Sequence, residues 1–140
     1  MVSHCVRYFA DSPVSLKTIG TALKSIDPQF KIDGGELTRA TELLGEIEIN
    51  SVGSDLFHEE LAMWTHALQR VANPAAGQTA ARLQGVQSIV MLTVMNGERD
   101  PGVTWDLLTP LWTVLPSISN GLTQVDGQGF YAGSQLIVQM

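Results

Sequence analysis

The sequence predicts an α+β fold: a ferredoxin-like β-α-β-β-α-β sheet with its helices on one face, extended by a C-terminal helix and a strand or hairpin. Segments with the two-residue period of strands and the 3.6-residue period of helices follow one another in this order. The 140 residues contain no repeat, low-complexity tract or linker, and this length is typical of one domain. We therefore expect residues 1–140 to form a single domain.

The first strand and the first helix have clear ends. The aromatic, β-rich segment Cys5–Ala10 predicts a strand that stops at Asp11-Ser12-Pro13. Ser15 suits a helix N-cap. The apolar residues that follow recur every three or four positions and predict one helical stripe, consisting of Leu16, Ile19, Leu23 and Ile26. Asp27-Pro28 ends this helix, because a residue before proline avoids the α region.

The period changes between residues 30 and 50. Phe30–Asp33 and Glu36–Arg39 flank Gly34-Gly35, which tolerates positive φ, so we expect a tight hairpin. Glu46–Ile49 alternates strictly, with two isoleucines on one face and two glutamates on the other. This pattern is typical of an antiparallel strand with one face in solvent.

The middle of the chain predicts two helices and a central strand. Ser54 or Asp55 caps a helix whose apolar residues step by four, three, four and three: Phe57, Leu61, Trp64, Leu68 and Val71. Asn73-Pro74 ends it, and a shorter helix is expected at Ala75–Gln84. Ser88–Met95 is apolar at nearly every position, which indicates a central strand covered on both faces.

The C-terminal part predicts a helix followed by one or two strands. After a polar loop at Asn96–Gly102, Thr104–Asn120 is expected to be helical, with Pro110 and Pro116 kinking it or dividing it in two. Gly121 suits the left-handed residue after a helix end. The remaining strands are expected at Leu122–Val125 and Gly133–Gln139, with a turn at Asp126-Gly127.

Charge and composition exclude several classes of function. The net charge is −6, and no cluster of lysine and arginine is present to bind nucleic acid or an anionic membrane. The longest apolar run, around Ile89–Met95, is too short to span a bilayer. Residues 1–12 lack the pattern of a signal peptide, so we expect a cytoplasmic protein. Only 16% of residues are charged, which favours a buried subunit interface and hence a homodimer.

The motif-like patterns do not form a recognisable catalytic or cofactor site. Gly127-x-Gly129-x-x-Ala132 resembles a dinucleotide-binding fingerprint, but no room remains after it for the helix and strand which that site requires. His58 and His66 point in different directions from one helix and cannot share a metal ion. Cys5, beside His4 on a strand, is expected to be a small buried thiol. We expect no cofactor, no metal and no catalytic residue.

Two groups of polar residues remain as candidates for ligand binding. Glu46 and Glu48 lie about 7 Å apart on one strand face, where they suit either the polar side of a sheet or acid–base chemistry. Asp126, Gln128 and Tyr131 suit either a tight hairpin with its aromatic rings turned inward or a small polar pocket. The three tryptophans, Trp64, Trp105 and Trp112, fall on apolar helical stripes and are expected in the core or in a subunit interface.

Two functional hypotheses follow. The sequence favours a non-catalytic protein-interaction domain that self-associates; one variant is an acidic inhibitor that masks a basic target. The alternative is a small-molecule-binding protein or a hydrolytic enzyme with its pocket near residues 126–131. A deep pocket that joins this segment to Glu46 or Glu48, and holds a carboxylate with a raised pKa, would favour the alternative.

Overall fold

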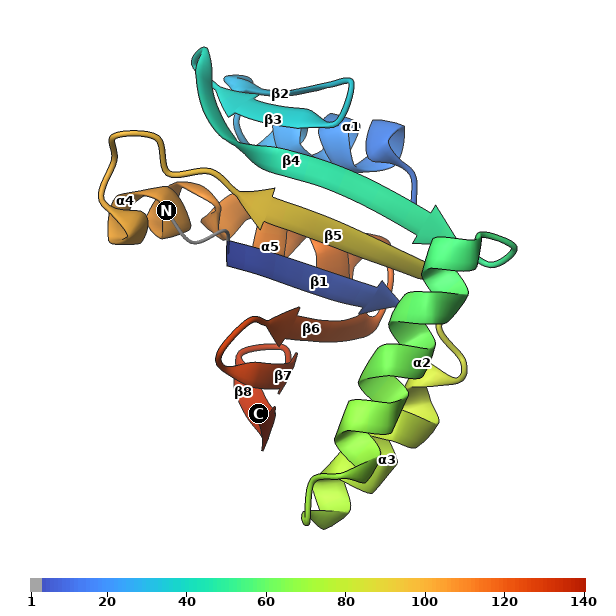
Figure 1. Cartoon of the computed structure of the whole chain (residues 1–140). Helices are drawn as coiled ribbons and strands as arrows, with labels where there is room; N and C mark the ends of the chain where they lie inside the picture. The colour runs from blue at the N-terminus through green and yellow to red at the C-terminus, as the bar shows by residue number, and fades with distance from the viewer. Residues whose placement is uncertain (1–3) are drawn as a thin grey trace.

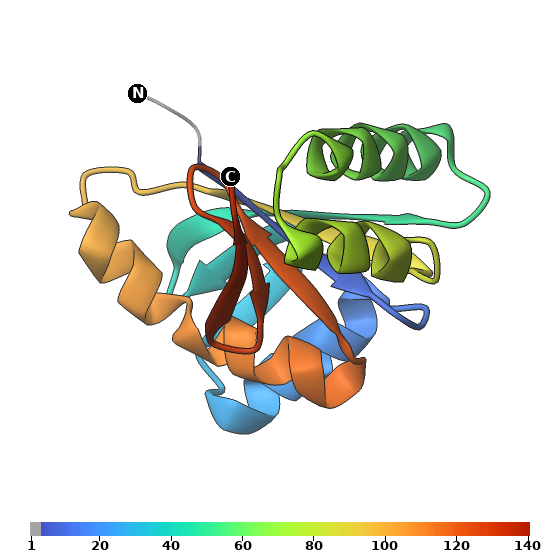
Figure 2. The same ribbon diagram turned by 90° about the horizontal axis from the view of Figure 1, so that it is seen from below.

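The computed structural model describes residues 4–140 and consists of one sheet between two layers of helices. The predicted α+β class is confirmed. The strands are β1 (His4–Ala10), β2 (Phe30–Asp33), β3 (Glu36–Arg39), β4 (Glu42–Ser51), β5 (Ser88–Val94), β6 (Gly121–Val125), β7 (Gly129–Ala132) and β8 (Gln135–Gln139). The helices are α1 (Leu16–Ile26), α2 (Asp55–Gln69), α3 (Pro74–Leu83), α4 (Pro101–Leu107) and α5 (Thr109–Ile118). Helices α1, α4 and α5 lie on one side of the sheet, and α2 and α3 lie on the other (Figures 1 and 2).

The strand order is β2-β3-β4-β5-β1-β6-β7-β8, and every neighbouring pair is antiparallel. This is not the ferredoxin-like order, so that part of the predicted fold is wrong. The difference lies in the position of β5, which is inserted between β4 and β1 and pairs with both along its whole length.

The connection between β4 and β5 explains this order. A single crossover helix carries the chain to the opposite end of a sheet, as the ferredoxin-like topology requires. Here α2 and α3 form a helical hairpin, which returns the chain to the end from which it left. Ser88, the first residue of β5, therefore lies opposite Ser51, the last residue of β4. The two strands become antiparallel neighbours.

The prediction that all helices lie on one face is also wrong, because the sheet is buried on both sides. In β1, Val6 and Tyr8 belong to the core beneath α1 and α5, whereas Phe9 belongs to the core beneath α2 and α3. Strand β5 divides in the same way, with Val90 in the first core and Ile89 in the second. The central, doubly covered position predicted for this strand is confirmed.

The predicted N-terminal elements are confirmed. Helix α1 begins after Ser15, whose hydroxyl accepts a hydrogen bond from the Thr18 backbone N–H at 3.2 Å. The β2–β3 hairpin turns at Gly34 and Gly35, which have φ values of +58° and +90°. Ile47 is buried in β4 between two exposed glutamates, as the alternating pattern predicts.

The region predicted as a helix kinked or divided in two forms two helices, α4 and α5, which meet at Leu108 just before Pro110. The strands that follow depart from the expectations in two places. Gly121 is not a left-handed cap but the first residue of β6, where a Cβ atom would overlap the Phe9 carbonyl oxygen. An additional strand, β7, forms, and its Phe130 is buried with its ring centroid 5.7 Å from that of Phe9. None of the helices described here is long and apolar enough to cross a membrane.

Candidate functional site

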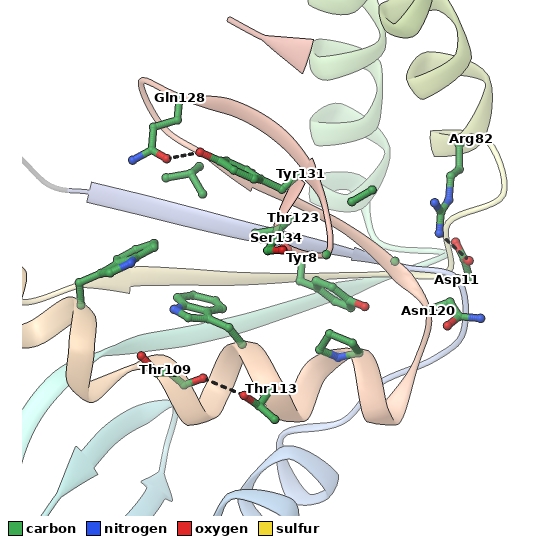
Figure 3. Close-up of a pocket in the computed structure, with 17 residues that line it drawn as sticks. Tyr8, Asp11, Arg82, Thr109, Thr113, Asn120, Thr123, Gln128, Tyr131 and Ser134 are labelled. Atoms are coloured by element: carbon green, nitrogen blue, oxygen red, sulfur yellow. Dashed lines mark hydrogen bonds and ion pairs between the residues drawn. The ribbon is translucent and has the colours of Figure 1, made fainter. Parts of the chain in front are cut away.

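A pocket of about 800 Å³ lies between helices α4 and α5 on one side and strands β6 and β7, with the turn that follows β7, on the other. Figure 3 shows the side chains that line it. Its volume is within the range of about 300–1,000 Å³ that is typical of small-molecule sites. Strands β1 and β6 form its floor, and residues of α3 and of the β1–α1 loop close one end.

The helical wall combines aromatic rings with hydroxyl groups. Trp105, Thr109, Trp112, Thr113 and Pro116 line the pocket and follow one another at spacings that keep them on one side of consecutive helical turns. The two indole rings lie with their centroids 5.5 Å apart and their planes tilted by 36°. The wall therefore offers a flat apolar surface beside two hydrogen-bonding side chains.

The pairing of β1 with β6 determines which side chains form the floor of the pocket. Tyr8 lies opposite Thr123 in this pairing, and both line the pocket together with Val125. The Tyr8 hydroxyl donates a hydrogen bond of 2.6 Å to the Ser119 carbonyl oxygen. Gly121 has no side chain, which leaves room for the Tyr8 ring, because a Cβ atom there would lie 2.8 Å from it. Burial raises the pKa of Tyr8 and the charge of Asp11 raises it further, although Arg82 partly offsets both.

This raised pKa predicts how stability depends on pH. The folded state favours the neutral phenol of Tyr8. The free energy of unfolding that this group contributes is therefore fully present below the ordinary pKa of 10.0, and it is lost as pH rises towards the folded-state pKa. We expect Tyr8→Phe to lower the free energy of unfolding by about 1 kcal/mol at pH 8, through loss of the hydrogen bond. The difference from wild type should narrow above pH 10. Urea unfolding at several pH values measures it, and a difference that widens would contradict this assignment.

The hairpin wall carries two of the residues singled out from the sequence. Gln128 and Tyr131 both line the pocket, and the Tyr131 hydroxyl donates a hydrogen bond of 2.7 Å to Gln128 Oε1. Gly133, with φ at +62°, and Ser134 form the turn between β7 and β8 at the rim of the pocket. The segment forms a hairpin in which the Phe130 ring is buried, whereas the Tyr131 ring lines the pocket.

The closed end of the pocket is polar. Arg82 Nη2 lies 3.4 Å from Asp11 Oδ2, and these side chains are 43% and 41% exposed. The backbone N–H of Asp11 donates to the Asn120 carbonyl oxygen at 2.8 Å, which brings the Asn120 side chain to the same end. Three segments far apart in the sequence thus place a cation, a carboxylate and an amide side by side (Figure 3).

The other sequence candidates lie elsewhere. Glu46 and Glu48 border a separate hollow of about 290 Å³ with Gly34 and Gly35. They face the side of the sheet opposite to Ile47 and therefore opposite to the pocket. Asp126 does not line the pocket. The structure thus brings Gln128 and Tyr131 together, but it does not join them to the two glutamates.

Asp126 belongs to a network around Arg7 on the α2 side of the sheet. The Arg7 guanidinium donates to Glu60 at 2.7 Å, to Gln124 at 2.9 Å and to Asp126 at 3.0 Å. It also lies over the Trp64 ring, 5.1 Å from the centroid. Burial by itself lowers the pKa of Arg7, but Glu60 and then Asp126 outweigh it and raise the pKa. This network joins α2 to the turn that leads into β7.

The histidines and the cysteine do not converge. The Cys5 sulfur lies 3.6 Å from the Thr93 hydroxyl, on a different side of the sheet from the pocket. His58 and His66 are exposed on α2. Among residues 4–140, no group of three or more histidine, cysteine, aspartate or glutamate side chains is placed to hold a metal ion.

Sequence reasoning missed most of the pocket wall. It assigned Trp105 and Trp112 to the core or an interface; both rings pack against the core but also line the cavity. Thr109 and Thr113 on the same helical stripe could have indicated this wall in the sequence. Hydroxyl groups are uncommon on a stripe that packs fully against a core. Arg82 gave no such signal, since its approach to Asp11 depends on the strand order.

The arrangement suits the binding of a flat organic group. Aromatic rings supply stacking surfaces, threonine and glutamine side chains supply hydrogen bonds, and one ion pair lies at the end. The chain matches no known family model, no curated protein and no solved structure.

Proposed function

We propose that the protein binds a small organic molecule in the pocket between helices α4 and α5 and strands β6 and β7. The observation that carries this proposal is a cavity of about 800 Å³ whose walls combine two tryptophans and two tyrosines with converging polar side chains. A cavity that is mainly apolar, with a few placed polar groups, is the usual form of a ligand site.

The chemistry of the walls supports binding rather than catalysis. The cavity is lined by one carboxylate, Asp11, and this group already lies against Arg82.

The indole N–H of Trp112 is buried and has no hydrogen-bond partner among residues 4–140. A buried donor without a partner costs about 1–3 kcal/mol. A ligand oxygen that reaches this group after a small shift of the ring would recover part of that cost.

Thermal-shift screening against a library of metabolites is the first test. A ligand at 100 times its dissociation constant should stabilise the protein by about 2.7 kcal/mol, which is a readily measured rise in Tm. Hits should also change the fluorescence of Trp105 and Trp112. A library that covers aromatic, heterocyclic and aliphatic compounds and yields no hit would overturn the proposal.

A variant that fills the pocket tests the location of the site. Thr113 is exposed and lines the cavity, so Thr113→Trp should occupy the ligand's space without disturbing the core. We expect at least tenfold weaker binding of any screened ligand, about 1.4 kcal/mol. Ser117 is the matched control, because it is exposed on the same helix and does not line the pocket. Equal binding by Thr113→Trp and Ser117→Trp, measured by calorimetry, would place the site elsewhere.

Self-association is a second candidate, and one observation favours it. Strand β8 forms an edge of the sheet, its residues Gln135–Gln139 carry no charge, and Leu136 is 42% exposed. The opposite edge, β2, carries Lys31 and Asp33, charges of the kind that discourage edge pairing. We expect light scattering after size exclusion to show a dimer that Leu136→Lys converts to a monomer. A wild-type monomer at micromolar concentration would contradict this candidate.

A further inference from the structure

We propose that the ligand joins a flat aromatic ring to a head group that carries both an ammonium and a carboxylate, as in an aromatic α-amino acid or a short peptide that contains one. This inference rests on the proposed function and goes further by naming the class of ligand. It depends on the contrast between the two ends of the pocket.

The polar end is able to bind both charges of such a head group. The single contact between Arg82 and Asp11 is 3.4 Å long, and both side chains are substantially exposed. An exposed ion pair of this kind is weak. Arg82 makes no other side-chain hydrogen bond within residues 4–140, so most of its five N–H donors are free for a ligand carboxylate. Asp11 can accept from an ammonium beside it.

The Asn120 amide and the net charge of the protein narrow the choice of ligand head group further. Asn120 stands next to Asp11 and Arg82 in Figure 3 and can donate to the same carboxylate. A purely anionic ligand would place its charge close to Asp11 in a protein of net charge −6. A purely cationic ligand would meet Arg82. A zwitterionic head group satisfies both side chains and adds no net charge.

The Tyr8 ring and Pro116 provide a place for the ligand's ring beside the polar end. Both line the pocket, and the Tyr8 hydroxyl bonds the Ser119 carbonyl oxygen, next in the chain to Asn120. A ring that packs on Tyr8 and Pro116 therefore lies near a head group bound by Arg82 and Asp11. The pocket continues past Trp112 to Trp105, Gln128 and Tyr131. This leaves space for a second residue, so dipeptides should bind more tightly than the free amino acid.

A matched series of compounds tests the head group. Calorimetric titrations would compare phenylalanine, phenylalaninamide without the carboxylate, 3-phenylpropionate without the ammonium, N-acetylphenylalaninamide without either charge, and the dipeptide phenylalanyl-phenylalanine. We expect removal of either charge to weaken binding at least tenfold, and the dipeptide to bind at least as tightly as phenylalanine. Equal binding of the uncharged compound would overturn the inference.

Two charge-removing variants assign each half of the head group to its partner. In Arg82→Gln, phenylalanine and phenylalaninamide should bind equally; in Asp11→Asn, phenylalanine and 3-phenylpropionate should bind equally. Both positions are exposed, so the fold should survive, which circular dichroism verifies. Arg70→Gln, at an exposed position at the end of α2, is the matched control and should change nothing.

The outcomes separate the ligand class from the proposed function. If no member of the series binds but a chemically different library compound binds in the pocket, the zwitterionic class is wrong and the binding function stands. If nothing in either collection binds, both fail. If the series binds with the expected order but Arg82→Gln leaves that order unchanged, the head group lies elsewhere and the inference is overturned.

Discussion

Gly129→Ala is expected to lower the free energy of unfolding by about 3 kcal/mol, because it combines backbone strain with a steric overlap. Gly129 has a φ of +130°, a region that is essentially restricted to glycine. A Cβ atom at this position would overlap the Val138 carbonyl oxygen of the neighbouring strand. Strand β8 would have to move away from β7, and the pocket would lose the support of its hairpin wall.

Gly127 provides the matched control in the same turn. Its φ is +78°, within the left-handed region, and a Cβ atom there meets nothing within 4 Å. Gly127→Ala should therefore cost only the left-handed strain, about 1–2 kcal/mol. Urea unfolding followed by circular dichroism measures both variants. Equal losses would show that the close approach of β7 and β8 is not what requires glycine at position 129.

Arg7→Met is the second substitution with a large expected effect, about 3–5 kcal/mol of unfolding free energy. The side chains of Arg7 and Glu60 are only 12% and 14% exposed, and methionine keeps an apolar chain near Trp64 while leaving the Glu60 carboxylate without its cation. The cost therefore comes mainly from the unpaired carboxylate. We expect the double variant Arg7→Met, Glu60→Leu to recover much of the lost stability.

Asp126 tests whether the large stability cost at Arg7 comes from the burial of the ion pair or from charge pairing alone. It bonds the same guanidinium as Glu60 does, but its side chain is 40% exposed. Asp126→Asn should accordingly cost less than about 1 kcal/mol. Thermal and urea unfolding of the single and double variants completes the comparison. A double variant less stable than Arg7→Met alone would mean that the network stabilises the fold through contacts other than this ion pair.

The local elements were predictable because each depends on residues close together in the sequence. Ser15 and Asp27-Pro28 define α1, and the stripe that begins at Phe57 lies in α2 as far as Leu68, with Val71 just beyond the helix end. The doubly buried β5 was also predictable from its continuous apolar run. That run already required helices on both faces of the sheet, which conflicts with the one-sided arrangement predicted alongside it. The apolar run in β5 by itself predicts the observed layers, with the sheet covered on both faces.

Strand order and most of the pocket depend on long-range geometry that a single sequence does not contain. Whether α2 and α3 act as one crossover or as a returning hairpin is decided by how they pack, and this choice places β5. The same choice brings Arg82 to Asp11, 71 positions away. Gln128 and Tyr131 were found because a turn segment with such residue types is recognisable locally, and the separation of Glu46 and Glu48 from them was not.

Chemical-shift mapping of the three indole N–H signals tests the central claim most directly. Trp105 and Trp112 line the pocket, whereas Trp64 lies on the other side of the sheet near Arg7. Single Trp→Phe variants assign each signal. When a ligand found by screening is added, we predict that the signals of Trp105 and Trp112 shift with saturation while that of Trp64 stays in place. A shift confined to Trp64, or saturated binding that moves neither pocket signal, would contradict the proposed site.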